Sequence, residues 1–239
     1  MRIAAYQFQS TTDHMDNFHR MVQAIRLAAE QNVRLLTFPS YALSGFPTDN
    51  QMWEYQLVEL SKHLFSYSEL YCMDIIFGAA ARNDLFQTTG RESFLEHWFV
   101  AIPPEHRKPI QYIRLPYDHS PKPTSINRFY IWKSDRFRVD FYLCYPFNGQ
   151  TAESSSDVLI GNKSGVFLFC EPYEGYPAEV QMRMLEGIRL KVAADHGLGM
   201  GLNNCFPKQT ISSFSIDRNG TCGYLVPCNS EGLISLDLA

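Results

Sequence analysis

Short apolar runs alternate with amphipathic stretches along this chain, and this order constrains the fold more than any single motif. Runs that predict strands cover residues 2–9, 35–38, 74–80, 94–102, 138–145 and 157–160. Helical periodicity begins after Asp16-Asn17 and recurs over residues 51–71 and 178–196. Consecutive apolar strands are typical of sheets that helices cover, so the sequence predicts an α/β protein.

The last part of the chain has a different pattern. Residues 210–238 predict a series of short strands, and Arg218-Asn219-Gly220 predicts a hairpin turn between two of them. No internal repeat, low-complexity tract or linker interrupts the sequence. Because α/β chains of 239 residues often form one unit, we expect residues 1–239 to be a single domain.

Charge and cysteine usage narrow the range of partners. The net charge is −4, and no Arg/Lys cluster contains interleaved aromatic residues, so we expect neither a nucleic acid nor a membrane as partner. The N-terminus turns polar too early for a secretory signal. The six cysteines match no Cys-x-x-Cys pattern, and no group of residues has metal-ligand spacing. We therefore expect reduced thiols in a cytoplasmic protein without metal or cofactor.

The segment 35–47 begins as an apolar strand and ends in a turn set by Pro39, Gly45 and Pro47. It resembles the segment after the second strand of the nitrilase, or carbon-nitrogen hydrolase, superfamily, which usually reads Phe-Pro-Glu-x-x-x-x-Gly-Tyr/Phe-Pro. The glutamate of that segment is the general base, and its position here is Ser40. A serine hydroxyl is far too weak a base to take a proton from a thiol near neutral pH.

The resemblance runs along the chain in order. Residues 138–145 resemble the strand that delivers the family's nucleophile, residues 156–160 resemble the next strand, and Arg189 resembles the arginine of a family helix. Residues 215–220 and 232–238 resemble the final strand pair. The resemblance implies the family fold, a four-layer α-β-β-α sandwich.

The family's chemistry uses a cysteine nucleophile, a glutamate base, a lysine that stabilises the oxyanion, and a second glutamate. By resemblance, Cys144 is at the nucleophile position and Arg114 at the lysine position, whereas residues 115–135 contain no match for the second glutamate. The segment after Cys144 is shorter than in the family, and Pro146 and Gly149 disfavour an immediate helix. We therefore expect an altered or filled pocket.

Each of these residues also has a simpler interpretation. Cys144 can be a small buried filler, and Ser40 can hydrogen-bond its own turn. His119, next to Asp118, could replace the missing base, but a solvated loop histidine is the simpler explanation. His196, after Asp195, can cap a helix C-terminus without any chemical role.

These observations lead to two hypotheses about the function. The preferred hypothesis is a nitrilase-like protein with a degraded Glu-Lys-Cys site that acts by binding, as a scaffold, a non-catalytic subunit or a sensor of a small amide-like ligand. The alternative is an active thiol-dependent amidase with Cys144 as nucleophile, Arg114 as oxyanion stabiliser and an unidentified base. An unrelated α/β protein is the third possibility.

The resemblance implies at least a homodimer. The helix at 178–196 could contribute to it, although its apolar stripe could equally face its own sheet.

Overall fold

The computed structural model describes most of the N-terminal half of the chain and parts of the C-terminal half. The described residues are 1–45, 52–82, 95–106, 108–115, 129–132, 140–144, 165–169, 179, 186, 189, 190, 193, 198–201, 213–223, 226, 227 and 230–238. For residues 114–115, 129–132, 140–144, 165–169, 199 and 201 the description concerns the backbone only.

The first sheet contains six strands in the order β11-β1-β2-β3-β4-β5. Its centre is parallel, and antiparallel strands flank it on both sides. The strands are β1 (Arg2–Gln7), β2 (Val33–Thr37), β3 (Asp74–Arg82), β4 (Leu95–Ile102), β5 (Gln111–Leu115) and β11 (Gly232–Asp237).

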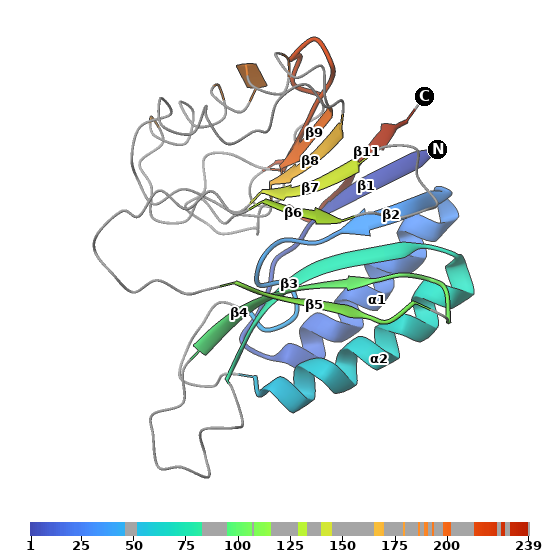
Figure 1. The fold of residues 1–239 in the computed structure, drawn as a ribbon, viewed down its shortest axis with the longest axis vertical. Coiled ribbons are helices and arrows are strands. Elements are labelled where there is room, and N and C mark those ends of the chain that lie inside the picture. Colours follow the sequence, from blue (N-terminus) through green and yellow to red (C-terminus); the bar gives the residue numbers. More distant parts are fainter. Residues whose placement is uncertain are drawn as a thin grey trace.

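Helices α1 (His14–Glu30) and α2 (Glu54–Tyr71) connect the parallel strands and cover one face of this sheet (Figure 1). Their apolar side chains and those of the strands form one cluster, which we call the helix-facing cluster; it includes Met21, Ile25, Leu64, Phe77 and Val100. Burial of the apolar side chains that the two helices contribute to this cluster, rather than intrinsic helix propensity, stabilises both helices.

The start of α1 differs from the sequence-based expectation. Asp16-Asn17 was expected to precede the helix, but the helix begins at His14 and Asp13 is its N-cap. The Asp13 carboxylate accepts hydrogen bonds from the amides of Met15 and Asp16, and these bonds lower the pKa of Asp13. An aspartate can cap a helix in this way, so Asn17 is left for a tertiary contact described below.

The second sheet contains five strands in the order β10-β9-β8-β7-β6. It packs on the face of the first sheet that the helices leave uncovered (Figure 1). Ile3, Leu35, Ile76 and Phe99 of the first sheet form the inter-sheet cluster with Met200 of the second. The strands are β6 (Phe129–Trp132), β7 (Asp140–Cys144), β8 (Gly165–Phe169), β9 (Leu198–Gly201) and β10 (Phe214–Ile216).

Gln7 ties the two sheets together. Its fully buried amide donates to the carbonyl oxygens of Pro227 and Ser230, at 2.7 Å each, and accepts from the amide of Ser213 at 2.6 Å. Ser213 immediately precedes β10, so a side chain at the end of β1 fixes the start of a strand in the other sheet.

The hairpin turn predicted at 218–220 is confirmed. Asp217 accepts hydrogen bonds from the amides of Asn219 and Thr221, and Gly220 has a φ of 77°. Arg189 donates to the Gly220 carbonyl at 3.1 Å and pairs with Glu186, so this arginine holds the turn against its helix.

Sequence reasoning missed the strands β6, β8 and β9. Gly199, three residues after the helix predicted at 178–196, lies inside β9. Residues 179, 186, 189, 190 and 193 are helical, as predicted, whereas the strand predicted at 157–160 lies outside the described residues.

Candidate functional site

Ser40 lies in a tight turn that follows the C-terminal end of β2. Several backbone hydrogen bonds fix the turn: the Pro39 carbonyl accepts from Ala42 and Gly78, and the Tyr41 carbonyl accepts from Gly45. Ser40 itself is only 5% exposed. The position that resembles that of the family's base is therefore held rigidly inside the protein.

Two side chains also hold this turn. Asn17 of α1 donates to the Leu43 carbonyl at 3.1 Å, and the Ser44 hydroxyl accepts from the amide of Ala80 in β3 at 2.8 Å. Gly45 has a φ of 71° and lies so close to the Thr11 carbonyl that a side chain would overlap it. A glycine is required here on both counts.

Gly78 shows on which face of the sheet Ser40 lies. A Cβ atom at position 78 would overlap the Ser40 backbone. Side chains alternate along a strand, so position 78 faces the same way as Ile76, which belongs to the inter-sheet cluster. The Ser40 turn therefore crosses β3 on the face that packs against the second sheet.

A buried tyrosine–histidine pair adjoins Ser40. The Tyr41 hydroxyl lies 3.1 Å from Nδ1 of His97, and the two rings meet edge-on with centroids 5.1 Å apart. His97 is 3% exposed and stands opposite Ala80 in the β3–β4 ladder, on the same face as Gly78. Sequence analysis missed this pair because no local pattern links residues 56 positions apart.

Arg114 lies near the end of β5, opposite Trp98 of β4. Strands β2 and β5 run in the same direction within the sheet, so Arg114 and Ser40 are at the same end of it. Trp98 packs against the helix-facing cluster, and residues opposite each other in a ladder share a face. On register, Arg114 is therefore on the helix-covered face, and its role at the site stays a prediction.

Cys144 is the last residue of β7, in the second sheet, opposite Phe129 of β6 and Phe169 of β8. Strand β7 ends on the same side of the molecule as β5 (Figure 1). The nucleophile role of Cys144 stays a prediction. Asp118, His119, Pro146, Gly149, Asp195 and His196, which the sequence analysis weighed, lie outside the described residues.

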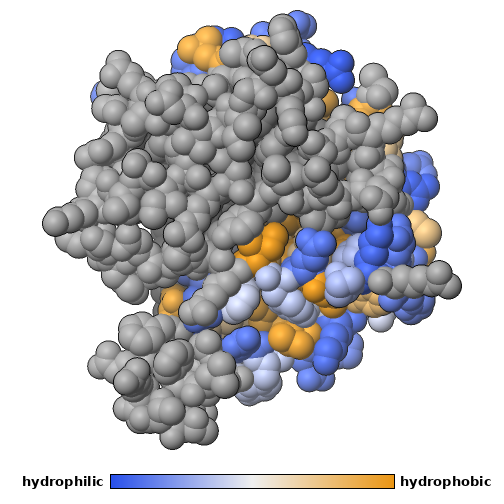
Figure 2. Space-filling model, in the orientation of Figure 1, coloured by the Kyte–Doolittle hydropathy of each residue, from blue (hydrophilic) through white to orange (hydrophobic). Residues whose placement is uncertain are grey.

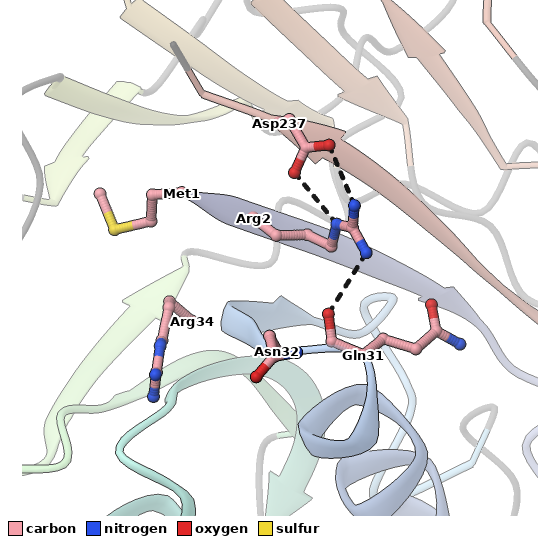
Figure 3. Close-up of a pocket in the computed structure, with 6 residues that line it drawn as sticks. All are labelled: Met1, Arg2, Gln31, Asn32, Arg34 and Asp237. Atoms are coloured by element: carbon pink, nitrogen blue, oxygen red, sulfur yellow. Dashed lines mark hydrogen bonds and ion pairs between the residues drawn. The ribbon is translucent and has the colours of Figure 1, made fainter.

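A pocket of about 410 Å³ opens at the other end of the parallel strands (Figure 3). Arg2 makes a bidentate ion pair with Asp237 at its rim, with both N–O distances 3.0 Å, and also donates to the Gln31 carbonyl. This pairing raises the pKa of Arg2 and lowers that of Asp237. Active sites of open α/β sheets lie at the carboxyl ends of parallel strands, so this pocket is not the predicted site.

The rest of the described surface gives no sign of a further site. Its large exposed hydrophobic side chains, such as Met15, Leu27, Tyr55 and Leu70, come from different parts of α1 and α2, and the visible described surface mixes hydrophobic and hydrophilic residues (Figure 2). In the described part of the chain, no cluster of His, Cys, Asp and Glu could hold a metal ion. None of the described helices is long and apolar enough to span a membrane.

Comparison with known proteins identifies the class to which this fold belongs. Residues 2–95 match the carbon-nitrogen hydrolase family. The amidase NitN from Nesterenkonia sp. AN1 superposes over 100% of this chain and 93% of its own, with a TM-score of 0.72 and 14% identity. No curated protein sequence matches the chain.

Two further solved structures are variants of the Nesterenkonia amidase, and both cover 100% of this chain at 14% identity. One, a cysteine-to-alanine variant in complex with butyramide, is covered over 90% of its length with a TM-score of 0.72. The other, with a glutamate replaced by glutamine, shows the Michael addition of acrylamide at the active-site cysteine; 93% of it is covered, with a TM-score of 0.73.

The chain therefore matches the carbon-nitrogen hydrolase family over residues 2–95 and shares its fold with an amidase from the nitrilase superfamily. It has the mixed α/β fold of the superfamily's amidase over its whole length, including the six-stranded sheet that carries the Ser40 turn.

Proposed function

We propose that this protein binds a small amide-like ligand at the end of its two sheets and does not hydrolyse it by the glutamate-dependent route of its superfamily. The observation that carries the proposal is Ser40, which is buried in a rigid turn where the family has its base. The turn is held by several hydrogen bonds, and its residue 40 carries no carboxylate. A site that keeps its frame and loses its base retains the means to bind but not to deprotonate a thiol.

The spacing of two residues supports this assignment. Ser40 and Cys144 are 104 positions apart in this chain. The glutamate and the cysteine that were changed together in an amidase variant bound to acrylamide are also 104 positions apart. We therefore assign Ser40 to the base position and Cys144 to the nucleophile position; Arg114 stays at the lysine position by sequence resemblance alone, because register places it on the other face of the sheet from the Ser40 turn.

The loss of the glutamate in the amidase suggests what this site can still do. A glutamate-to-leucine variant of that enzyme carries the acetamide moiety of fluoroacetamide on its active-site cysteine. This chain has a serine at the corresponding position, so it resembles such a variant. We infer that its pocket admits small amides, with Cys144 beside them.

The proposal includes four further features. The arrangement is the four-layer α-β-β-α sandwich of the family. Residues 1–239 form a single domain, and two copies form a homodimer. The protein acts in the cytoplasm, where its six cysteines stay reduced. Light scattering after gel filtration tests the dimer directly.

Calorimetric titration with butyramide, combined with an assay for ammonia release, tests the main function. We expect saturable binding without release of ammonia, and binding that weakens when Cys144→Trp fills the site. Cys72→Trp is the matched control, because Cys72 is exposed at the end of α2. Turnover of butyramide by the wild-type protein, or the absence of any binding, would contradict the proposal.

A second candidate is a thiol-dependent amidase built on Cys144, and the buried Tyr41–His97 pair is the observation that favours it. A histidine near Cys144 could serve as the base that Ser40 cannot be. The ammonia assay separates this candidate from the first.

A further inference from the structure

We propose that the pocket at the amino-terminal end of the parallel strands binds a small oxyanion, the carboxylate or phosphate group of a small molecule, and that Arg34 recognises this group. Arg2 and Arg34 lie at the starts of β1 and β2, whereas the Ser40 turn follows the end of β2. The inference therefore goes beyond the proposed amide site and concerns a second site with different chemistry.

Four segments of the chain form this pocket, which is large enough for a small ligand. Its volume is about 410 Å³, and ligand pockets commonly measure roughly 300–1,000 Å³. The start of β1, the turn between α1 and β2, the start of β2 and the end of β11 line it (Figure 3). The polar groups of four elements thus meet in one cavity.

The charge of Arg2 is already compensated within the pocket. Its guanidinium group makes the bidentate ion pair with Asp237 and donates to the Gln31 carbonyl, at the carboxyl end of α1, at 3.3 Å. The amides of Gln31 and Asn32 close the last turn of α1 by donating to its carbonyl groups. Arg2 therefore covers the negative end of the helix, which would otherwise repel an anion.

Arg34 has no comparable partner within the described part of the chain. Its half-buried side chain donates one hydrogen bond, to the Tyr71 carbonyl at 3.4 Å, which is long for a bond of this type. The ion pairs among the described residues do not include it. A guanidinium group has five N–H donors in a planar fork that matches a carboxylate or a phosphate. Arg34 is therefore the group in this pocket that can hold an anion.

Gln31 and Asn32 add neutral donors beside Arg34. Asn32 has a φ of 58°, and the chain reverses here from α1 into β2. In Figure 3 the Asn32 side chain lies between those of Arg34 and Gln31. Both amide side chains belong to exposed residues, and neither makes a hydrogen bond with another described group. Their N–H groups are suitable second donors to an oxyanion.

The net charge of the molecule makes this a local property of the pocket. The chain carries a net charge of −4, which does not attract anions over long distances. Saturable binding of an anion therefore requires a site that holds it by direct contacts.

Calorimetric titration of the protein with sodium citrate, and separately with sodium phosphate, tests this site at constant ionic strength. We expect saturable binding of at least one of the two anions, with a Kd of about 1 mM or tighter. The anion that binds shows whether the recognised group is a carboxylate or a phosphate.

Arg34→Gln is the main variant. It keeps a polar side chain but removes the positive charge, so the anion should bind about tenfold more weakly, because hydrogen bonds between charged groups are the strong ones. Arg218→Gln is the matched control. It removes the same charge from an exposed position in the hairpin turn, outside the pocket, and it should leave the affinity unchanged.

Asp237→Asn has the opposite expected effect. It removes the carboxylate that pairs with Arg2, so the anion should bind about two- to threefold more tightly. The loss of the same ion pair lowers the stability of the fold, and a general loss of structure does not raise an affinity. Asp237→Asn therefore decides the question if Arg34→Gln does not fold.

Two results would overturn the proposal: no saturation by either anion, or an unchanged affinity in folded Arg34→Gln. Butyramide is uncharged and its proposed site is at the other end of the strands, so it should bind equally well to Arg34→Gln and to the wild-type protein. The oxyanion site and the amide site can therefore fail independently of each other.

Discussion

At the scale of single residues, the site depends on positions where a side chain has no room. Gly78 and Gly45 let the Ser40 turn lie directly on β3 and on the Thr11 backbone. The buried Asn17 amide and the Ser44 hydroxyl then satisfy backbone groups that the turn would otherwise bury without partners. The frame around Ser40 is therefore specified by small and polar residues, not by the hydrophobic core.

Gly78→Ala should be among the most damaging small substitutions in the chain. Its new methyl group would overlap backbone atoms of Ser40, which cannot move without breaking the turn. We expect a loss of about 1–3 kcal/mol in the free energy of unfolding, measured by urea denaturation. Gly223→Ala is the matched control, because its methyl group would meet the Ser215 hydroxyl, which can rotate away. Equal costs for the two variants would argue against a rigid turn.

Ser40→Glu tests whether the rest of the site is still competent. A carboxylate at this position restores the residue type that takes the thiol proton in the family, and general bases typically contribute about 10²- to 10⁴-fold in rate. We expect ammonia release from butyramide to become measurable. Ser40→Gln introduces a side chain of nearly the same shape as glutamate but without a basic carboxylate oxygen, and this variant should remain inactive. If Ser40→Glu folds and is also inactive, the pocket has lost more than its base.

At the scale of elements, the predictions from sequence succeed where periodicity is strong. Residues of β3 and of α2 show clear apolar patterns and fold as expected. In contrast, β9 reads Leu-Gly-Met-Gly, and glycine is depleted in strands. It is extended because β8 and β10 pair with it on either side, which is a tertiary effect.

The candidate site also contains features that the sequence predicts and features that it does not. The turn around Ser40 could be predicted, because Pro39 and Gly45 restrict the backbone locally. His97 could not, because its contact with Tyr41 depends on the register of the β3–β4 ladder. The face on which Arg114 lies also comes from a ladder, that of β4 and β5, and the sequence gives no indication of it.

Gln7 provides a test of how the sheets are joined. Gln7→Leu fills a similar volume but leaves the Pro227 and Ser230 carbonyls and the Ser213 amide without this partner in a buried place. We expect a loss of about 2–4 kcal/mol in the free energy of unfolding. Gln9→Leu, an exposed position two residues further on, should change stability by less than about 0.5 kcal/mol. A similar small effect at Gln7 would mean that the sheets hold together without it.

The ion pair between Arg2 and Asp237 predicts an acid-dependent contribution to stability. The pKa of Asp237 is lower in the folded protein than in the unfolded chain, so this contribution is present above the unfolded value and is lost as pH falls through the folded one. Asp237→Asn should lower the unfolding temperature by about 1–3 °C at pH 7 and by progressively less as the pH falls toward 2. High salt should reduce the difference, because both partners are exposed. A difference that persists at pH 2 would point to packing instead.

At the scale of the whole molecule, two sheets meet so that several candidate groups gather at one end. Ser40, Tyr41 and His97 come from the first sheet and its turn, and Cys144 comes from the end of β7 in the second. The proposed site therefore needs both sheets. A loss of the contact between the sheets should therefore affect ligand binding before it affects the helices that cover the first sheet.

The pairing of β1 with β11 has a consequence for how the protein folds during translation. The amino group of Met1 donates to the Leu238 carbonyl, and the ladder continues from Arg2–Asp237 to Gln7–Gly232. While the chain is being translated, β1 and β2 can associate early, but the outer edge of β1 must wait for β11. At common elongation speeds this wait is roughly 10–50 s, far longer than local folding takes. An uncovered strand edge is a template for association with other chains, so the newly made protein is most in need of chaperones during that interval.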